Sequence, residues 1–223
     1  MTKAKPKLFA WDFHGTLEQG TEVGFAEILR RLAKDIKYKV KIDLEEVRKL
    51  YGISVLDYLK HFFPKIANEE LVNLRLKIRT AQNRRDIAKH TRAAPYAREV
   101  LVKIKEVGHK NIVVSTSSKA HINWFLKTVG LFRHLDAIFA IDRHALDIKF
   151  DIAKEKAETI KKYAQENQVS VGNIVVIGDR LGDIDAGRLI GTKTYQYINP
   201  DFPKVKTRAD VKITDLREIL KEI

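Results

Sequence analysis

Polar side chains with possible chemical roles follow three separate apolar stretches of the sequence. Asp12 follows the run Leu-Phe-Ala-Trp and precedes a Gly-Thr turn, Ser115 and Thr116 follow Ile-Val-Val, and Asp179 follows Ile-Val-Val-Ile-Gly. An apolar run that ends abruptly on a polar residue is typical of a buried strand whose tip reaches a site. In an open α/β sheet such tips lie along one edge, where ligands bind. The sequence therefore predicts one site that contains Asp12, Ser115, Thr116 and Asp179.

A further carboxylate, Asp183, follows Asp179 by four positions in a segment that begins a helix. Asp12, Asp179 and Asp183 would repel one another at one sheet edge unless a cation neutralised them. Oxygen ligands favour a hard ion, and Mg²⁺ suits a partly open site that keeps waters and a phosphate oxygen. The pattern therefore predicts a Mg²⁺ site. Asp185 is interpreted instead as a helix N-terminal charge that complements the helix dipole.

The elements that must position these residues alternate between strand and helix after Pro95. Such alternation is typical of a parallel sheet covered by helices on both faces. We therefore predict an α/β fold, a Rossmann-like doubly wound parallel sheet. The predicted strands cover 7–13, 111–116, 137–141, 173–179, 192–198 and 210–213, and the predicted helices cover 97–107, 118–129, 151–166, 183–190 and a final segment capped by Thr214.

The stretch that follows the first strand has helical periodicity and hardly any strand signal. Phe25, Ile28, Leu29, Leu32 and Ile36 fall on one helical face. Further helices are predicted to begin at the capping residues Asp43, Ser54 and Asn68, and another passes through 84–85. These stripes indicate the core of a small helical bundle. The predicted organisation is a catalytic core formed by 1–17 and 91–223, with a helical insertion at 18–90.

The composition indicates a soluble intracellular protein. The 223 residues are 44% hydrophobic, include no cysteine and hold no run of membrane-spanning length. We therefore expect a cytoplasmic protein that has no membrane partner. A formal net charge of +13 is spread nearly evenly along the chain, which favours a solvated surface over nucleic-acid binding, with attraction of an anionic substrate as an alternative. The many charged residues and the single methionine are typical of a thermophile.

Four segments together resemble the motifs of the haloacid dehalogenase superfamily. They are Asp12-Phe-His-Gly-Thr-Leu, Val-Val-Ser115-Thr, Lys149-Phe-Asp and Gly-Asp179-x-x-x-Asp183. The resemblance covers the whole chain, because the helical insertion after the first strand is similar to the helical cap of subfamily I. It implies a Mg²⁺-dependent phosphatase that hydrolyses small phosphomonoesters, with a small phosphorylated metabolite as its partner.

The resemblance also implies a role for each matching residue. Asp12 would attack phosphorus and form an aspartyl-phosphate. Mg²⁺ would be held by Asp12, the backbone carbonyl of His14 and Asp179, and Asp183 would bind it through water or fix the loop. Ser115, in preference to Thr116 or Ser117, would hydrogen-bond a phosphoryl oxygen. Lys149, with Lys154 as the alternative, would place a positive charge on the same group.

His14 departs from the pattern of phosphatases in this family, which normally carry a second Asp at that position. Histidine can transfer protons near neutral pH, so His14 is predicted to act as the acid and base of the reaction. It could also lower turnover, or only fill the turn. Two alternative functions therefore stay open: a metal-independent hydrolase resembling the dehalogenases, and a catalytically weak binding protein.

Overall fold

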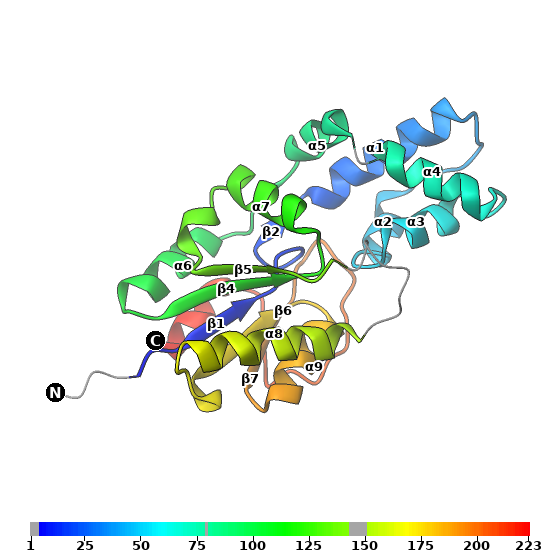
Figure 1. Ribbon diagram of the computed structural model, residues 1–223. Helices are drawn as coiled ribbons and strands as arrows, with labels where there is room; N and C mark the ends of the chain where they lie inside the picture. The colour runs from blue at the N-terminus through cyan, green and yellow to red at the C-terminus, as the bar shows by residue number, and fades with distance from the viewer. Residues whose placement is uncertain (1–4, 79, 143–150) are drawn as a thin grey trace. The chain divides into compact units, whose positions relative to one another are not determined.

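The computed structural model describes residues 5–78, 80–142 and 151–223, and the chain divides into two compact units (Figure 1). The α/β unit consists of Met1–Glu18, Ala93–Pro200 and Lys204–Ile223. The helical unit consists of Gln19–Arg92 together with Asp201–Pro203. Within the described residues, no helix is long and apolar enough to cross a membrane.

Six parallel strands of the described residues form the sheet of the α/β unit, in the order β5-β4-β1-β6-β7-β8, which confirms the predicted fold class. The chain adds β4 and β5 on one side of β1, then β6, β7 and β8 on the other. The strand order therefore reverses at β1, and such a reversal is where open α/β sheets bind ligands. The strands are β1 (Leu8–Trp11), β4 (Lys110–Ser115), β5 (Ala137–Ala140), β6 (Ile174–Gly178), β7 (Lys193–Tyr197) and β8 (Val211–Ile213).

Helices cover the sheet because its central strands are apolar on both faces. Helices α8 (Ile152–Glu166) and α9 (Leu181–Ile190) lie side by side on one face (Figure 1). They pack against alternate side chains of β1, β4 and β6, including Leu8, Ala10, Ile112, Val114, Ile174 and Val176. The remaining helical elements of the unit are α6 (Ala97–Glu106), α7 (Lys119–Thr128), η1 (Phe132–His134), η2 (Val171–Asn173) and η3 (Leu216–Glu222).

The last element, η3, differs from the prediction in its type and in its cap. It is a 3-10 helix, and the side chain of Asp215, not Thr214, accepts the hydrogen bond from Arg217 N. An aspartate whose side-chain oxygen accepts from the backbone N–H two residues ahead is a common helix start. The difference lies at the end of the chain and does not alter the sheet.

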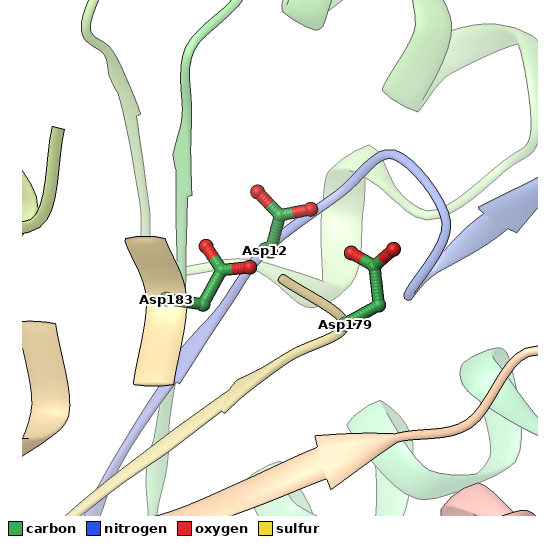
Figure 2. A group of neighbouring side chains, drawn as sticks. All are labelled: Asp12, Asp179 and Asp183. Atoms are coloured by element: carbon green, nitrogen blue, oxygen red, sulfur yellow. The ribbon is translucent and has the colours of Figure 1, made fainter. Parts of the chain in front are cut away.

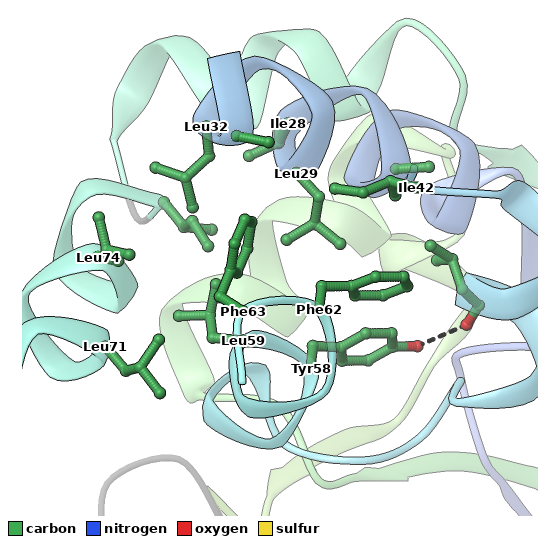
Figure 3. Packing of buried hydrophobic residues seen from close by; sticks show 14 residues of the cluster. Ile28, Leu29, Leu32, Ile42, Tyr58, Leu59, Phe62, Phe63, Leu71 and Leu74 are labelled. Atoms are coloured by element: carbon green, nitrogen blue, oxygen red, sulfur yellow. Dashed lines mark hydrogen bonds between the residues drawn. The ribbon is translucent and has the colours of Figure 1, made fainter. Parts of the chain in front are cut away.

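The helical unit is a bundle whose core is built from the predicted apolar stripes. Its helices are α1 (Thr21–Asp35), α2 (Leu44–Lys49), α3 (Val55–Phe62), α4 (Asn68–Ile78) and α5 (Ala81–Ala88). Asp43 and Ser54 cap α2 and α3 as predicted, whereas Asn68 is the first residue of α4 and not its cap. Figure 3 shows the core, in which Ile28, Leu29 and Leu32 of α1 pack with Leu59, Phe62, Phe63, Leu71 and Leu74.

Three residues that follow β7, Asp201–Pro203, belong to the helical unit, whereas the prediction includes them in the core segment 91–223. The rings of Phe202 and Tyr51 lie 4.5 Å apart, and Arg48 Nη2 lies 3.6 Å from Asp201 Oδ1. Two short strands that the sequence does not predict, β2 (Glu18–Gln19) and β3 (Arg92–Ala93), pair with each other where the chain passes between the units.

Candidate active site

Three carboxylates meet at the carboxyl edge of the sheet (Figure 2). Asp12 directly follows β1, Asp179 directly follows β6, and the two strands are neighbours in register. The backbone N–H of Asp12 donates to the carbonyl of Ile177 at 2.8 Å, which extends the ladder to the site. Asp183 comes from the first turn of α9, and one oxygen from each of the three carboxylates lies within 4.8 Å of the others. Chain topology therefore brings together residues more than 160 positions apart.

Glycines allow the backbone to approach these carboxylates closely. Gly15 has a φ of +82°, and a Cβ at this position would lie 2.8 Å from Asp179 Oδ2. A Cβ at Gly178 would overlap the Asp183 side chain. A larger residue at either position would displace a carboxylate, because its side chain would occupy the same space, and at Gly15 it would also be strained by the positive φ.

The start of helix α9 fixes Asp183. Its Oδ2 accepts a hydrogen bond of 3.1 Å from the backbone N–H of Arg180, and its own backbone N–H donates to the Arg180 carbonyl at 3.2 Å. Reciprocal bonds of this kind satisfy groups that a helix N-terminus would otherwise leave unpaired. The same bonds hold the carboxylate toward the sheet edge.

A buried lysine joins the carboxylate cluster. Lys156 of α8 is 4% exposed, and its Nζ lies 2.7 Å from Asp12 Oδ1 and 2.5 Å from Asp183 Oδ1. Burial alone would lower the pKa of this ammonium group, but the facing carboxylates of Asp12 and Asp183 outweigh burial and raise it above its usual value. Lys156 is therefore a fixed positive charge beside Asp12.

Counted over the described residues alone, the charge balance of the cluster is negative. Lys156 and Arg180, whose Nε lies 2.9 Å from Asp179 Oδ2, supply two positive charges against three carboxylates. Burial, with the nearby charge of Asp12 as the next cause, raises the pKa of Asp183 to about 6 and that of Asp179 well above its usual value. Both shifts mean that burial and the repulsion between the carboxylates disfavour the ionised form of Asp179 and Asp183. Three carboxylate oxygens with excess negative charge fit a hard divalent cation such as Mg²⁺.

The lysine predicted from the motif resemblance, Lys149, lies outside the described residues. Its predicted alternative, Lys154, is exposed, and its Nζ lies 4.0 Å from Glu158 Oε1, so it is not part of the carboxylate cluster. Sequence reasoning missed Lys156, although a signal was present: Ile152, Lys156, Ile160 and Ala164 follow one another at intervals of four. A lysine within an apolar helical stripe indicates a buried charge that needs a partner.

Ser115 and Thr116 occupy the adjoining strand tip, where β4 ends beside β1. Ser115 is buried, and its Oγ accepts a hydrogen bond of 3.2 Å from the backbone N–H of Ser117. Thr116 is half-buried. Both are placed at the same sheet edge as Asp12, because β1 and β4 are parallel neighbours.

The side chain of His14 is not part of the carboxylate cluster. Its Nδ1 lies 2.8 Å from Glu18 Oε1, and its Nε2 lies 3.1 Å from Ser117 Oγ. The ring is partly exposed, with 23% of its side-chain surface accessible. Sequence reasoning singled out neither Glu18 nor Ser117 as a partner of His14, although the spacing of four residues from His14 to Glu18 can bring two side chains together.

The fold and the sequence now define the class of protein. The sequence pattern of haloacid dehalogenase-like hydrolases matches residues 9–196, and the chain belongs to this family. It is therefore a hydrolase. No curated protein matches the chain in sequence.

Solved structures share the fold at low sequence identity. A predicted phosphoglycolate phosphatase from Haemophilus somnus 129PT is 18% identical, with a TM-score of 0.78 and 98% of each chain covered. A haloacid dehalogenase-like family hydrolase from Streptococcus pneumoniae is 16% identical, with a TM-score of 0.75 and 99% of each chain covered. A family hydrolase from Deinococcus radiodurans R1, with bound phosphate and sodium, is 19% identical; its TM-score is 0.70, with 98% of this chain and 96% of that chain covered.

Proposed function

We propose that the protein is a Mg²⁺-dependent phosphatase that hydrolyses small phosphomonoesters through an aspartyl-phosphate on Asp12. The observation that carries this proposal is the group of three carboxylates at the sheet edge, with the Lys156 ammonium group between Asp12 and Asp183. Membership of the hydrolase family supports it, as does the phosphate bound by the Deinococcus radiodurans protein. The absence of cysteine favours a cytoplasmic location. The proposed substrate is a small phosphorylated metabolite.

Asp12 is the proposed nucleophile. Its carboxylate oxygen attacks phosphorus, the bond from phosphorus to the leaving oxygen breaks, and the leaving alcohol takes up a proton. Water then attacks the phosphorus of the aspartyl-phosphate, which releases inorganic phosphate and regenerates Asp12. Covalent catalysis of this kind divides one difficult displacement into two easier ones.

Lys156 is the proposed source of fixed positive charge. Its Nζ holds Asp12 at 2.7 Å and stabilises the negative charge that the phosphoryl group brings to the site. Ser115, at the tip of β4, is proposed to hydrogen-bond a phosphoryl oxygen, with Thr116 beside it. His14 is proposed to give the Nε2 proton of its imidazolium form to the leaving group, and the neutral ring that remains is proposed to take a proton from the attacking water.

Asp12, Asp179 and the backbone carbonyl of His14 are proposed to hold Mg²⁺, with Asp183 bound through water or fixing the loop. When bound, Mg²⁺ would offset the repulsion between the nucleophile and the anionic phosphate. Asp179 contributes the carboxylate that the Gly15 turn approaches most closely.

A screen of p-nitrophenyl phosphate and phosphorylated metabolites tests this function. We expect hydrolysis by the wild-type protein in Mg²⁺ and a loss of at least about 100-fold in EDTA, restored by excess Mg²⁺. The measurement is phosphate release. Activity that is unaffected by EDTA on a non-phosphate substrate would support the metal-independent alternative, and no hydrolysis in Mg²⁺ would contradict the proposal.

Thermal unfolding at different pH values tests the charge balance. The folded-state pKa of Asp183 is about 6, above the unfolded value of about 3.9, so this group stabilises the metal-free protein fully below about pH 4. That stability is lost as pH rises through about 6. We therefore expect Mg²⁺ to raise the Tm strongly at pH 7 and little at pH 4.5, because at pH 4.5 protons compete with Mg²⁺ for the carboxylates.

Asp183→Asn should remove the contribution of this carboxyl group to the pH dependence of the Tm in EDTA. It should also reduce the rise in Tm that Mg²⁺ causes. Asp185→Asn is the matched control, because Asp185 is two residues away on the same helix and its Oδ1 pairs with Arg208 at 3.5 Å. A Tm that responds equally to Mg²⁺ in both variants would show that Asp183 is not coupled to the ion.

A further inference from the structure

A buried glutamate, Glu18, lies beside His14 at the end of the turn that follows Asp12. The backbone N–H groups of Leu17 and Glu18 both donate to the Phe13 carbonyl, at 2.9 and 3.2 Å, and this tight turn brings Glu18 beside His14. The Glu18 side chain is fully buried. A buried carboxylate is costly unless a hydrogen-bond donor faces it. The imidazole Nδ1 of His14, 2.8 Å from Oε1, faces it here.

The His14 ring is fixed on its other sides as well. Its Nε2 lies 3.1 Å from Ser117 Oγ, on the loop that follows β4. Phe13 and Phe125 contact the ring edge-to-face, with centroids 5.0 and 5.1 Å away and interplanar angles of 74° and 86°. Two polar contacts and two aromatic contacts leave the ring little freedom to rotate, so both nitrogens have defined partners.

The chemistry of these partners assigns the hydrogen on the ring. An ionised carboxylate only accepts hydrogen bonds, so an ionised Glu18 places the hydrogen of this pair on Nδ1. In the neutral ring Nε2 then has a free lone pair, and the Ser117 hydroxyl donates to it. The hydrogen bond at one ring nitrogen thus decides which form the other takes.

We propose that Glu18 is a positioning residue, which holds His14 with its hydrogen on Nδ1 and thereby makes Nε2 the nitrogen that serves the reaction. The consequence for catalysis rests on the proposed function, whereas the position of the hydrogen on the ring does not. This pair gives His14 one defined orientation at a position where phosphatases of the family normally carry an aspartate. The Ser117 hydroxyl marks the direction in which Nε2 points.

The first test is spectroscopic and needs no substrate. Long-range ¹H–¹⁵N spectra of protein labelled in its seven histidines distinguish the two neutral ring forms, and His14→Gln identifies the His14 signals. At a pH where imidazole is neutral, we expect the Nδ1–H form in the wild type. The Nε2–H form in the wild type would overturn the proposal.

Variants of the two partners then separate their roles. In Glu18→Gln an amide NH₂ can face Nδ1, so we expect the Nε2–H form or a mixture, whereas Ser117→Ala should retain the Nδ1–H form. Glu22→Gln is the matched control, because Glu22 is another buried glutamate, 1% exposed, and its partner is Arg48 at 3.2 Å. It should leave the His14 signals unchanged. A Glu18→Gln protein that keeps the wild-type ring form would contradict the proposal.

The second test uses two substrates with different leaving groups. We expect Glu18→Gln to lower kcat for phenyl phosphate by about 10- to 100-fold with KM nearly unchanged, and to affect p-nitrophenyl phosphate less, because a good leaving group needs less help from an acid. An equal loss on both substrates would indicate a merely structural role and overturn the proposal. If the wild type hydrolyses no phosphomonoester, the proposed function fails while the spectra still decide the role of Glu18.

Discussion

Replacement of Asp12 by asparagine is expected to reduce phosphomonoester hydrolysis by at least about 10³-fold, because the amide cannot form the aspartyl-phosphate. The protein should still fold. Lys156 keeps its contact with Asp183, and an amide oxygen at position 12 can still accept from Lys156 Nζ. The measurement is kcat for p-nitrophenyl phosphate in saturating Mg²⁺, with circular dichroism to confirm the fold.

Asp185→Asn serves as the control for Asp12→Asn. It removes one carboxylate from the same unit, at a position whose partner is the surface residue Arg208. Its activity should equal that of the wild type. Retention of wild-type activity by Asp12→Asn would rule out Asp12 as the nucleophile, and with it the proposed mechanism.

Replacement of Lys156 by methionine is expected to lower kcat by about 10²- to 10³-fold, the usual cost of one stabilising group at a developing charge. It should also destabilise the metal-free protein, because Asp12 and Asp183 would face each other without the ammonium group between them. Mg²⁺ should restore part of this lost stability. Phosphatase assays and thermal unfolding, each with Mg²⁺ and with EDTA, measure the two effects.

Two further lysine variants make this test decisive. Lys154→Met removes an exposed lysine from the same helix, one whose partner is Glu158, and should behave as the wild type. Lys149→Met tests the residue that the motif resemblance implies. If Lys149→Met were inactive and Lys156→Met fully active, the role that we assign to Lys156 would belong to Lys149.

The sheet could be predicted from the sequence because its strands are unusually clear. The three central strands contain short apolar runs that end at a polar residue or a glycine: Leu-Phe-Ala-Trp, Ile-Val-Val and Ile-Val-Val-Ile. Strands of this kind are buried on both faces of a parallel sheet. The two-residue strands β2 and β3 could not be predicted, since segments so short have no periodicity. The attachment of Phe202 to the helical unit depends on a tertiary contact with Tyr51, which no local pattern encodes.

The candidate site was predictable to the extent that it depends on strand ends. Asp12 and Asp179 follow neighbouring strands, and Asp183 follows one helical turn later, so topology alone brings them together. Lys156 and Glu18 were missed for a common reason. Lys156 lies on the buried face of a helix that is otherwise highly charged, and Glu18 lies in the buried turn after β1. Sequence reasoning treats such isolated charges as solvated unless their partners are known. Those partners, Asp12 and His14, lie beside them only after folding.

The membership of Asp201–Pro203 in the helical unit means that the chain crosses between the two units four times, at 18/19, 92/93, 200/201 and 203/204. Excision of the segment 19–92 would therefore not yield a self-sufficient α/β protein. Phe202, only 8% exposed, would lose the ring of Tyr51 and become a solvent-facing aromatic side chain, which favours self-association. An exchange of the helical unit with that of a relative must therefore replace the segments 19–92 and 201–203 together.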